Sequence, residues 1–563
     1  MIYHNSYDQD CRVPFGAAKV SSKVKLTVTA DFACGAVLRT WTEENGEAKY
    51  EMHRASGDDF TVDITMPDYG TLLWYYFIIY YPSGDTCMYG APSDKQGGIG
   101  QEYQSNPESY QITVYKPTKT PSWFKNGIMY QIFPDRFYRG SDFEKLAKES
   151  GKHIVNDWYE SPSYIKNEAG DVTKWVFHGG TLLGIEEKLP YLKELGVNTI
   201  YLNPIFRAKS NHRYDTADYM MIDPLLGDEE SFKSLCKKAS KLDMHIILDG
   251  VFSHTGSDSI YYKEGSQYNE WYKKDENGNQ KYWWGVKDLP EVDETNESFN
   301  EYICGKHGVI NKWCYLGASG FRLDVADELP DSFIKNVKTR LKYENKDSIL
   351  IGEVWEDASN KFSHGERRKY LMGDELDSTM NYPIRDLLID FAQGNCDSFL
   401  TARRVMHLME NYPEEILYST MNLLGSHDRE RILTVLDSNK EMVKMLYALM
   451  YFLPGVPCIY YGDETCLEGE TDPYNRGPFP WGKEDKDMIE FFKDLGKTYN
   501  KHSALKNGKF LPYFLNNNVF AFTRFNDEEK MLVLANRSDE DIKVYLEGNE
   551  YEIPAFGTIC RAL

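Results

Sequence analysis

The sequence contains no apolar run long enough to cross a membrane. Its longest apolar stretches, Leu72–Tyr81 and Met445–Val456, fall short of the roughly 20 residues that a membrane-spanning helix needs. It begins MIYHNSYDQD, without a basic segment followed by an apolar one, so we expect no signal peptide and no membrane partner. The ten cysteines form no CxxC pair and no compact framework. This favours reduced thiols and a cytoplasmic protein.

Positive charge is also scarce. The 64 Lys and Arg residues face 87 Asp and Glu residues, which gives a formal net charge of -23. An acidic surface repels phosphate backbones, so we expect no nucleic-acid partner, whereas a neutral sugar remains compatible. The 41 tyrosines and 11 tryptophans are mostly explained by apolar cores, but their number also fits a protein that stacks sugar rings.

The chain is too long for a single compact core and predicts about three or four domains. Residues 1–118 alternate apolar and polar side chains between turn clusters, which indicates an N-terminal β-sandwich. Residues 119–505 are expected to form the central domain. Alternation returns in residues 506–563, which predicts a second, C-terminal β-sandwich domain.

Short apolar segments followed by amphipathic stretches recur through the central domain. The helical stretches include Ile185–Leu195 and Asp228–Lys241. Eight strands alternating with helices predict an α/β fold, a (β/α)8 TIM barrel. An aromatic-rich stretch after the third strand, at about 255–305, predicts an inserted subdomain. The expected strands are Gly127–Phe133, Val197–Leu202, His245–Leu248, Gly320–Leu323, Ile349–Ile351, Thr379–Tyr382, Thr420–Leu424 and Ile459–Tyr461.

Acidic residues stand where several of these strands end. In a barrel of this kind the carboxyl ends of the strands converge on one face, so the acids are expected to meet there. A single acid after a strand is most often a helix cap, but several on successive strands are hard to explain by capping alone. The acids are Asp249, Asp324, Glu353 and Asp428, accompanied by His254, Arg322 and His427.

A metal site is the sharper alternative, because His and carboxylate groups at strand ends bind zinc or iron. Arg322, two residues before Asp324, would oppose a metal cation and would instead keep Asp324 ionised. Glycoside hydrolysis needs one ionised and one protonated carboxyl group beside the scissile bond. That chemistry fits the set best.

Four segments resemble the conserved regions of the α-amylase family, glycoside hydrolase family 13. They occur in the family's order: Asp249-Gly250-Val251-Phe252-Ser253-His254, Gly320-Phe321-Arg322-Leu323-Asp324-Val325-Ala326-Asp327-Glu328, Gly352-Glu353-Val354-Trp355 and Gly425-Ser426-His427-Asp428. The resemblance implies that Asp324 is the nucleophile, that Glu353 is the general acid and base, and that Asp428 stabilises the transition state. His254 and His427 would donate hydrogen bonds to the sugar, and Asp249 would brace the site.

Two further segments resemble the branch of neopullulanases, cyclomaltodextrinases and maltogenic amylases. They are Met129–Phe137 and His212–Tyr219. The resemblance implies substrate contacts by His212, by Tyr214, which would stack on a sugar ring, and by the loop pair Asp472 and Arg476. Arg322, Glu328 and Trp355 complete the expected substrate-binding set, Glu328 on the acceptor side. Each has a structural alternative: Tyr214 as a core residue, and Asp472–Arg476 as a surface ion pair.

The resemblance further implies an α-glucan oligosaccharide or polysaccharide substrate. It also implies that residues 1–118 are similar to a starch-binding module, a domain that in this branch often contributes to a homodimer. We expect no cofactor and no bound metal. Ser253 stands where many relatives have a calcium-binding asparagine, and Tyr138–Ser141 and His178–Thr181 lack several oxygen ligands that calcium prefers. A transglycosylase or isomerase would share the same first half-reaction, so this alternative stays open. A catalytically dead scaffold is disfavoured because the three acids are intact.

Overall fold

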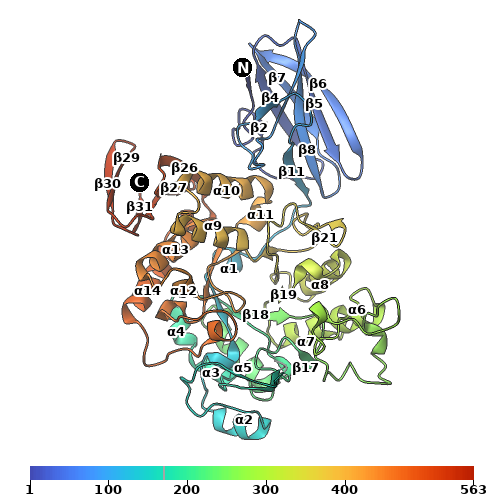
Figure 1. Ribbon diagram of the computed structural model, residues 1–563, viewed down its shortest axis with the longest axis vertical. Coiled ribbons are helices and arrows are strands. Elements are labelled where there is room, and N and C mark those ends of the chain that lie inside the picture. The colour runs from blue at the N-terminus through green and yellow to red at the C-terminus, as the bar shows by residue number, and fades with distance from the viewer. Residues whose placement is uncertain (169–171) are drawn as a thin grey trace. The chain divides into compact units, whose positions relative to one another are not determined.

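A computed structural model describes residues 1–168 and 172–563. The chain divides into two compact units (Figure 1). The first combines Met1–Lys119 with two later segments, Glu356–Asp377 and Cys396–Leu417, and the second holds the remainder. Within the described ranges, every helix is too short or too polar to cross a membrane.

The first unit is built on antiparallel strands around an apolar core. In β4 (Lys23–Ala30) every second residue is buried, because successive side chains of a strand point to opposite faces. This confirms the β-sandwich expected at the N-terminus. Its other main elements are β5 (Gly35–Thr42), β6 (Gly46–Ser56), β7 (Asp59–Thr65), β8 (Thr71–Tyr80), β9 (Thr86–Gly90), β11 (Tyr110–Tyr115), α10 (Ser398–Asn411) and α11 (Glu414–Leu417).

The second unit contains the predicted barrel. Among its described residues, eight parallel strands pair in the order β23-β20-β19-β18-β15-β12-β25-β24. A parallel bridge between Met380 and Met421 joins the two ends of this order and closes the barrel. The strands are β12 (Met129–Ile132), β15 (Thr199–Leu202), β18 (His245–Gly250), β19 (Gly320–Leu323), β20 (Ile349–Gly352), β23 (Ser378–Thr379), β24 (Met421–Leu423) and β25 (Val456–Tyr460).

Two expected elements differ in detail. The helix expected at Ile185–Leu195 is two short helices, α3 (Leu182–Glu187) and α4 (Leu189–Glu194), because Pro190 has no N–H to continue the first one. The strand expected at Thr379–Tyr382 ends at Thr379. There Asn381 caps α9 (Tyr382–Gln393) by accepting a hydrogen bond from the Ile384 amide, so Tyr382 is helical.

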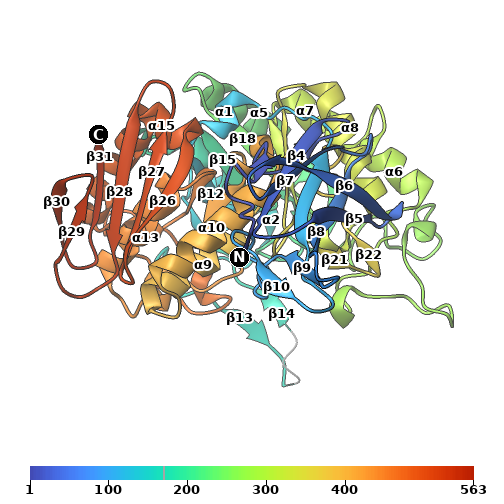
Figure 2. The same cartoon turned by 90° about the horizontal axis from the view of Figure 1, so that it is seen from above.

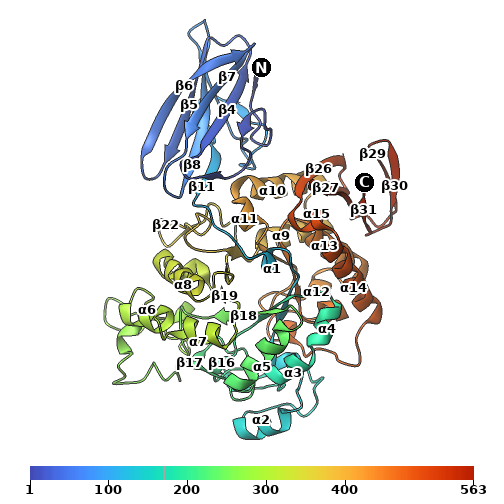
Figure 3. The ribbon, with the colours of Figure 1, turned by 180° about the vertical axis from the view of Figure 1, so that it is seen from behind.

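Helices surround the barrel strands, as Figure 3 shows from behind. The helix expected at Asp228–Lys241 is α5 (Glu229–Ser240), with Asp228 as its cap. The chain between β18 and β19 carries the short turns η2 (Asn269–Trp271) and η3 (Trp283–Gly285) before α6 (Glu297–Cys304) and α7 (Val309–Leu316). Other helices of this unit are α1 (Ser122–Lys125), α2 (Phe143–Ser150), α8 (Asp331–Glu344), α12 (Ile432–Val435), α13 (Lys440–Phe452), α14 (Lys486–Lys501) and α15 (Ser503–Asn507).

The chain ends in a small β-structure, the red strands of Figure 2. Strands β26 (Lys509–Asn516), β27 (Val519–Phe525), β28 (Lys530–Asn536) and β31 (Thr558–Ala562) form one antiparallel sheet. Strands β29 (Ile542–Leu546) and β30 (Asn549–Ile553) form a hairpin that shares an apolar core with it. The barrel with flanking β-domains is therefore confirmed.

Candidate active site

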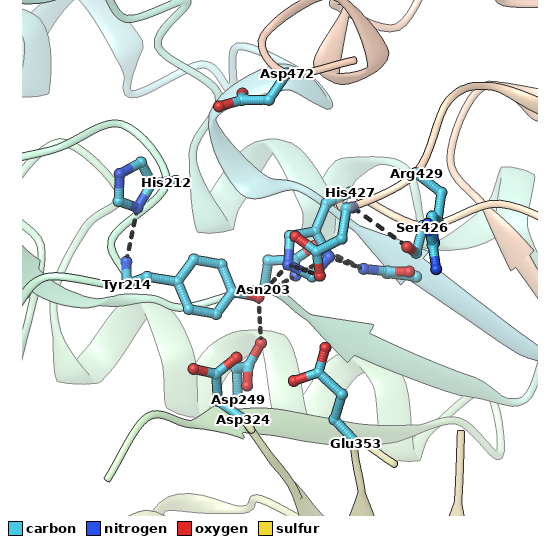
Figure 4. A network of polar contacts seen from close by, with 12 residues as sticks. Asn203, His212, Tyr214, Asp249, Asp324, Glu353, Ser426, His427, Arg429 and Asp472 are labelled. Carbon is cyan, nitrogen blue, oxygen red and sulfur yellow. Dashed lines mark hydrogen bonds and ion pairs between the residues drawn. The ribbon is translucent and has the colours of Figure 1, made fainter. Parts of the chain in front are cut away.

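The predicted acids gather at the carboxyl ends of neighbouring barrel strands. Asp249 lies near the end of β18, Asp324 directly follows β19 and Glu353 directly follows β20. These three strands are paired side by side, with Asp249 opposite Arg322. Asp428 reaches the same region from the loop after β24. Figure 4 shows the carboxylates of Asp249, Asp324 and Glu353 grouped together.

The fully buried guanidinium of Arg322 organises this group. Its Nη1 donates hydrogen bonds of 2.8 Å to Asp249 Oδ1 and to Asp324 Oδ1. Its Nη2 lies 2.9 Å from Glu353 Oε2, but at an angle that makes no hydrogen bond. The backbone N–H of Val325 donates to the same Glu353 oxygen at 2.7 Å. The guanidinium of Arg322 therefore hydrogen-bonds Asp249 and Asp324 but not Glu353.

Burial governs the protonation of these acids. It raises the pKa of Glu353 to about 7, against the lowering effect of Arg322 and with the added repulsion of Asp428. Burial also raises the pKa of Asp324, and Arg322 opposes this shift. Because both carboxyl groups lie around one guanidinium, they compete for protons, and a Glu353 pKa of about 7 allows one of them to be protonated near neutral pH. The hydrogen bond from Arg322 to Asp324 favours Glu353 as the residue that carries it.

Tyr214 and His427 stack beside the acids. Their ring centroids lie 5.1 Å apart, with planes inclined by 3°. The Tyr214 hydroxyl donates to Asp249 Oδ2 at 2.8 Å and lies 2.6 Å from His427 Nε2 (Figure 4). Burial lowers the pKa of His427 well below its usual value, and Arg476 and Arg322 add to this effect, so the ring is neutral.

Three polar residues that the sequence did not single out complete this network. Gln131 Nε2 donates to His427 Nδ1 at 2.9 Å, and Asn203 Nδ2 donates to the Tyr214 hydroxyl at 2.9 Å. Tyr201 donates its hydroxyl to Asp249 Oδ2 at 2.6 Å. The sequence pattern that could have indicated them is a polar side chain inside or directly after a buried strand. Gln131 and Tyr201 lie in β12 and β15, and Asn203 follows β15.

Arg476 links Asp472 to Asp428. Its Nη1 lies 3.0 Å from Asp472 Oδ1, its Nη2 lies 3.6 Å from Asp428 Oδ1, and its Nε donates to the His427 carbonyl at 2.9 Å. The Nδ1 atom of His212 accepts a hydrogen bond of 3.0 Å from the Tyr214 backbone N–H. These contacts join Asp472 and Arg476 to the acid group rather than leaving them as an isolated surface pair.

The other predicted residues lie around the edge of the site. His254 is buried, and its Nδ1 lies 2.9 Å from the Ser253 hydroxyl. Trp355 stacks on Tyr382, with centroids 4.1 Å apart and planes inclined by 9°. Glu328 belongs to the short turn η4 (Ala326–Glu328), and its carboxylate accepts hydrogen bonds from two tryptophans.

The segments that would hold calcium in relatives have a different donor set here. Arg139 donates to the carbonyl oxygens of His178 at 2.8 Å and Val155 at 2.7 Å, so a guanidinium engages oxygens that a hard cation would need. The Ser253 hydroxyl is engaged with His254. These residues do not fit a calcium ion. Across residues 1–168 and 172–563, no group of three or more His, Cys, Asp and Glu residues could hold a metal.

Fold and site together define a (β/α)8-barrel protein with a buried carboxylate group at the carboxyl ends of its strands. The chain belongs to the α-amylase family: the model of the α-amylase catalytic domain matches residues 131–506. It is 34% identical to an amylopullulanase from Thermoanaerobacter thermohydrosulfuricus over 93% of this chain and 40% of that protein. The chain thus spans less than half the length of that relative.

Two shorter proteins are also similar. Neopullulanase 2 from Thermoactinomyces vulgaris is 32% identical, over 84% of this chain and 79% of that protein. A solved structure of a cyclomaltodextrinase superposes with a TM-score of 0.72 at 25% identity, covering 99% of this chain and 98% of that one. The predicted resemblance to this branch is confirmed.

Proposed function

We propose that this protein is a retaining α-glucan hydrolase. Its substrates would be maltodextrins, pullulan or cyclodextrins, cleaved at α-1,4 and to a smaller extent at α-1,6 bonds. The observation that carries the proposal is Arg322, which hydrogen-bonds Asp324 while Glu353, with a pKa of about 7, stands at its other terminal nitrogen. An ionised and a protonated carboxyl group side by side are what this reaction requires.

In the first step, a carboxylate oxygen of Asp324 would attack the anomeric carbon. Glu353 would give its proton to the departing glycosidic oxygen, so that the shortened glucan leaves as an alcohol and an ester to Asp324 remains. In the second step, ionised Glu353 would take a proton from water as the water oxygen attacks the same carbon. The ester breaks, Asp324 is again ionised, and Glu353 is again protonated.

The neighbouring residues would bind the sugar that reacts. Asp428 and neutral His427 and His254 offer hydrogen-bonding groups that strengthen as positive charge develops on the ring. Tyr214 offers an aromatic face, although its hydroxyl is fixed by Asp249. Asp472 and Arg476 would bind the non-reducing end of the glucan. The names of the similar proteins, which mention pullulan and cyclic maltodextrins, support this substrate class.

The test is a product profile on pullulan, cyclodextrin and starch. Panose from pullulan would support α-1,4 cleavage, maltotriose would indicate α-1,6 cleavage, and failure to cleave any α-glucan would overturn the proposal. Products longer than the substrate in a maltotriose time course would instead assign transglycosylation. Asp324→Asn is expected to reduce turnover by at least about 10⁴-fold, with glucan binding largely retained. Retained activity would refute Asp324 as the nucleophile.

Localisation and assembly remain proposals. No disulfide joins any two cysteines of the described ranges, and Cys34 is exposed, which supports a reducing compartment such as the cytoplasm. A homodimer formed through the N-terminal domain remains a prediction, and size-exclusion chromatography with light scattering would measure it.

A further inference from the structure

A loop between β18 and β19 carries two adjacent tryptophans next to the site. An antiparallel bridge pairs Tyr282 with Pro290, and the next residue, Glu291, is bridged to His254. Inside the loop, the backbone N–H of Trp283 donates a hydrogen bond to the backbone carbonyl of Leu289 at 2.9 Å. The backbone of the loop is therefore tied directly to a predicted site histidine.

The rings of this loop continue outward from that histidine. The centroids of His254 and Trp283 lie 4.9 Å apart, with planes inclined by 30°. Trp283 in turn stacks on Trp284 at 5.3 Å and 24°. His254 is buried, whereas Trp284 is 79% exposed. A continuous series of aromatic faces thus runs from the site to solvent.

Glu328 holds both indoles. Its Oε2 accepts a hydrogen bond from Trp283 Nε1 and its Oε1 accepts one from Trp284 Nε1, each at 2.7 Å. An ionised carboxylate is a strong acceptor, so two such bonds fix the tilt of both rings. With an indole on each oxygen, Glu328 is engaged in orienting the tryptophans.

The conformation and exposure of Trp284 contribute little to the stability of the fold. Its φ is +49°, a left-handed conformation that bulky residues rarely adopt, and most of its indole faces water. A residue held in a sparsely populated conformation, with little apolar burial in return, indicates a functional constraint. Glucose units have apolar faces formed by ring C–H groups, which stack on aromatic faces.

The loop lies on the side of Glu353, the group assigned to protonate the departing glucan. The Val325 N–H donates to Glu353 Oε2 at 2.7 Å, and the Glu328 N–H donates to the Val325 carbonyl at 2.8 Å. The short turn that carries Glu328 is therefore attached to the general acid. Asp472, which would bind the non-reducing end of the glucan, lies apart from Glu353 in Figure 4.

We propose that Trp283 and Trp284, clamped by Glu328, form a stacking platform for the glucan segment on the leaving-group side of the scissile bond. Glu328 is a positioning residue that acts through the two indoles, and the platform favours substrates with two or more glucose units beyond the cleavage point. This inference rests on the proposed function, because that function defines the leaving-group side.

The test compares two substrates. Maltoheptaose can occupy the platform, whereas α-maltosyl fluoride has no sugar on the leaving-group side. The ratio of kcat/KM for maltoheptaose to kcat/KM for α-maltosyl fluoride is expected to fall about tenfold in Trp284→Ala, mainly through KM. Tyr315→Ala, which removes another exposed aromatic side chain of the same unit, serves as the matched control and is expected to leave the ratio unchanged. An unchanged ratio in Trp284→Ala would overturn the platform.

A double-mutant cycle tests the positioning role of Glu328. Glu328→Ala is expected to lower the ratio as Trp284→Ala does, and the double variant should lose no more than either single one, because both act through the same contact. Glu328→Gln, whose amide oxygen still accepts one indole, should recover part of the ratio. Fully additive losses would mean that Glu328 contacts the sugar by itself, which would overturn its positioning role.

A binding measurement separates this inference from the proposed function. Binding is measured with Asp324→Asn, which is expected to bind the glucan without cleaving it. Maltoheptaose is expected to quench the tryptophan fluorescence of Asp324→Asn, with about tenfold weaker affinity when Trp284→Ala is added. If Asp324→Asn binds maltoheptaose through Trp284 but the wild type cleaves neither substrate, the platform stands and the hydrolase proposal falls. Equal affinity with and without Trp284→Ala, or no binding to Asp324→Asn, would overturn the platform.

Discussion

At the residue scale, one buried arginine organises the carboxyl groups of the site. Arg322 hydrogen-bonds two aspartates and leaves Glu353 without an aligned donor from its guanidinium, so neighbouring carboxyl groups differ in their affinity for a proton. A buried cation with several acids around it is stable only as a set, because removing one member leaves the others as uncompensated charges. This explains why the sequence surrounds it with Asp249, Asp324 and Glu353.

This difference predicts a bell-shaped dependence of kcat/KM on pH. In the proposed mechanism Glu353 must be protonated to release the leaving group and Asp324 must be ionised, so activity is expected to fall as pH rises through about 7, the pKa of Glu353. Asp324 must be ionised to attack, and because burial raises its pKa, activity is expected to fall again as pH drops. Steady-state kinetics on maltoheptaose over a range of pH would measure both limbs.

The fluoride substrate provides the control for this profile. Fluoride leaves without a proton, so the alkaline limb should weaken with α-maltosyl fluoride while the acidic limb stays. An alkaline limb of equal steepness with both substrates would assign that limb to a group other than Glu353.

At the element scale, the loop that carries Asp428 is fixed by the end of the next barrel strand. Arg431 is fully buried, and its Nη1 lies 2.9 Å from Asp463 Oδ1, just beyond β25. Its guanidinium lies over the ring of Tyr460, at 4.0 Å from the centroid. Tyr447 in α13 donates to the second oxygen of Asp463 at 2.5 Å. Strand, helix and loop therefore meet at one ion pair.

Asp463→Ala is expected to be strongly destabilising. It leaves the Arg431 charge buried and unpaired, at a cost of about 3–5 kcal/mol in the free energy of unfolding. Because the Asp428 loop is then less well held, kcat should also fall. Thermal unfolding followed by circular dichroism, together with kinetics at a temperature where the variant is folded, would measure both effects.

Tyr447→Phe is the matched control for this variant. It removes only a hydroxyl hydrogen bond and should cost about 1 kcal/mol. If Asp463→Ala lost no more stability than Tyr447→Phe, the ion pair would not be what fixes the loop.

At the scale of the whole molecule, the first unit is not a simple N-terminal module. It includes Glu356–Asp377 and Cys396–Leu417, which leave and rejoin the barrel sequence. Within this unit, Arg12 Nη1 donates to Glu410 Oε1 of α10 at 2.7 Å, with both side chains buried. The N-terminal strands and α10 therefore share a buried ion pair.

A chain that begins at Thr120 is expected to fold poorly. It would retain α10 but lose the N-terminal strands that belong to the same unit, so residues of α10 that are buried in the full chain would face water. Soluble yield, thermal unfolding and resistance to limited proteolysis would measure the loss. The control is full-length Arg12→Met/Glu410→Met, which removes both charges and should be more stable than Glu410→Ala alone. A truncated chain as stable as the full one would contradict the shared core.

The strand-by-strand pattern was sufficient to predict the barrel, its flanking β-domains and the acids at the strand ends. Periodicity is a local property, so β4 and α5 could be predicted from their own residues. The same pattern does not predict where helices end, because Pro190 and the cap at Asn381 override it.

The sequence is enough to predict the fold class and the set of residues around Asp324, Glu353 and Asp428, because strand order brings them to one face whatever their neighbours are. Which hydrogen bonds form among them follows only from the folded structure. That Arg322 aligns with the aspartates rather than Glu353, and that Glu328 holds two indoles, depends on side-chain directions and burial. Distances between residues far apart in the chain carry no local sequence signal, and they set the pKa values and the contacts of the site.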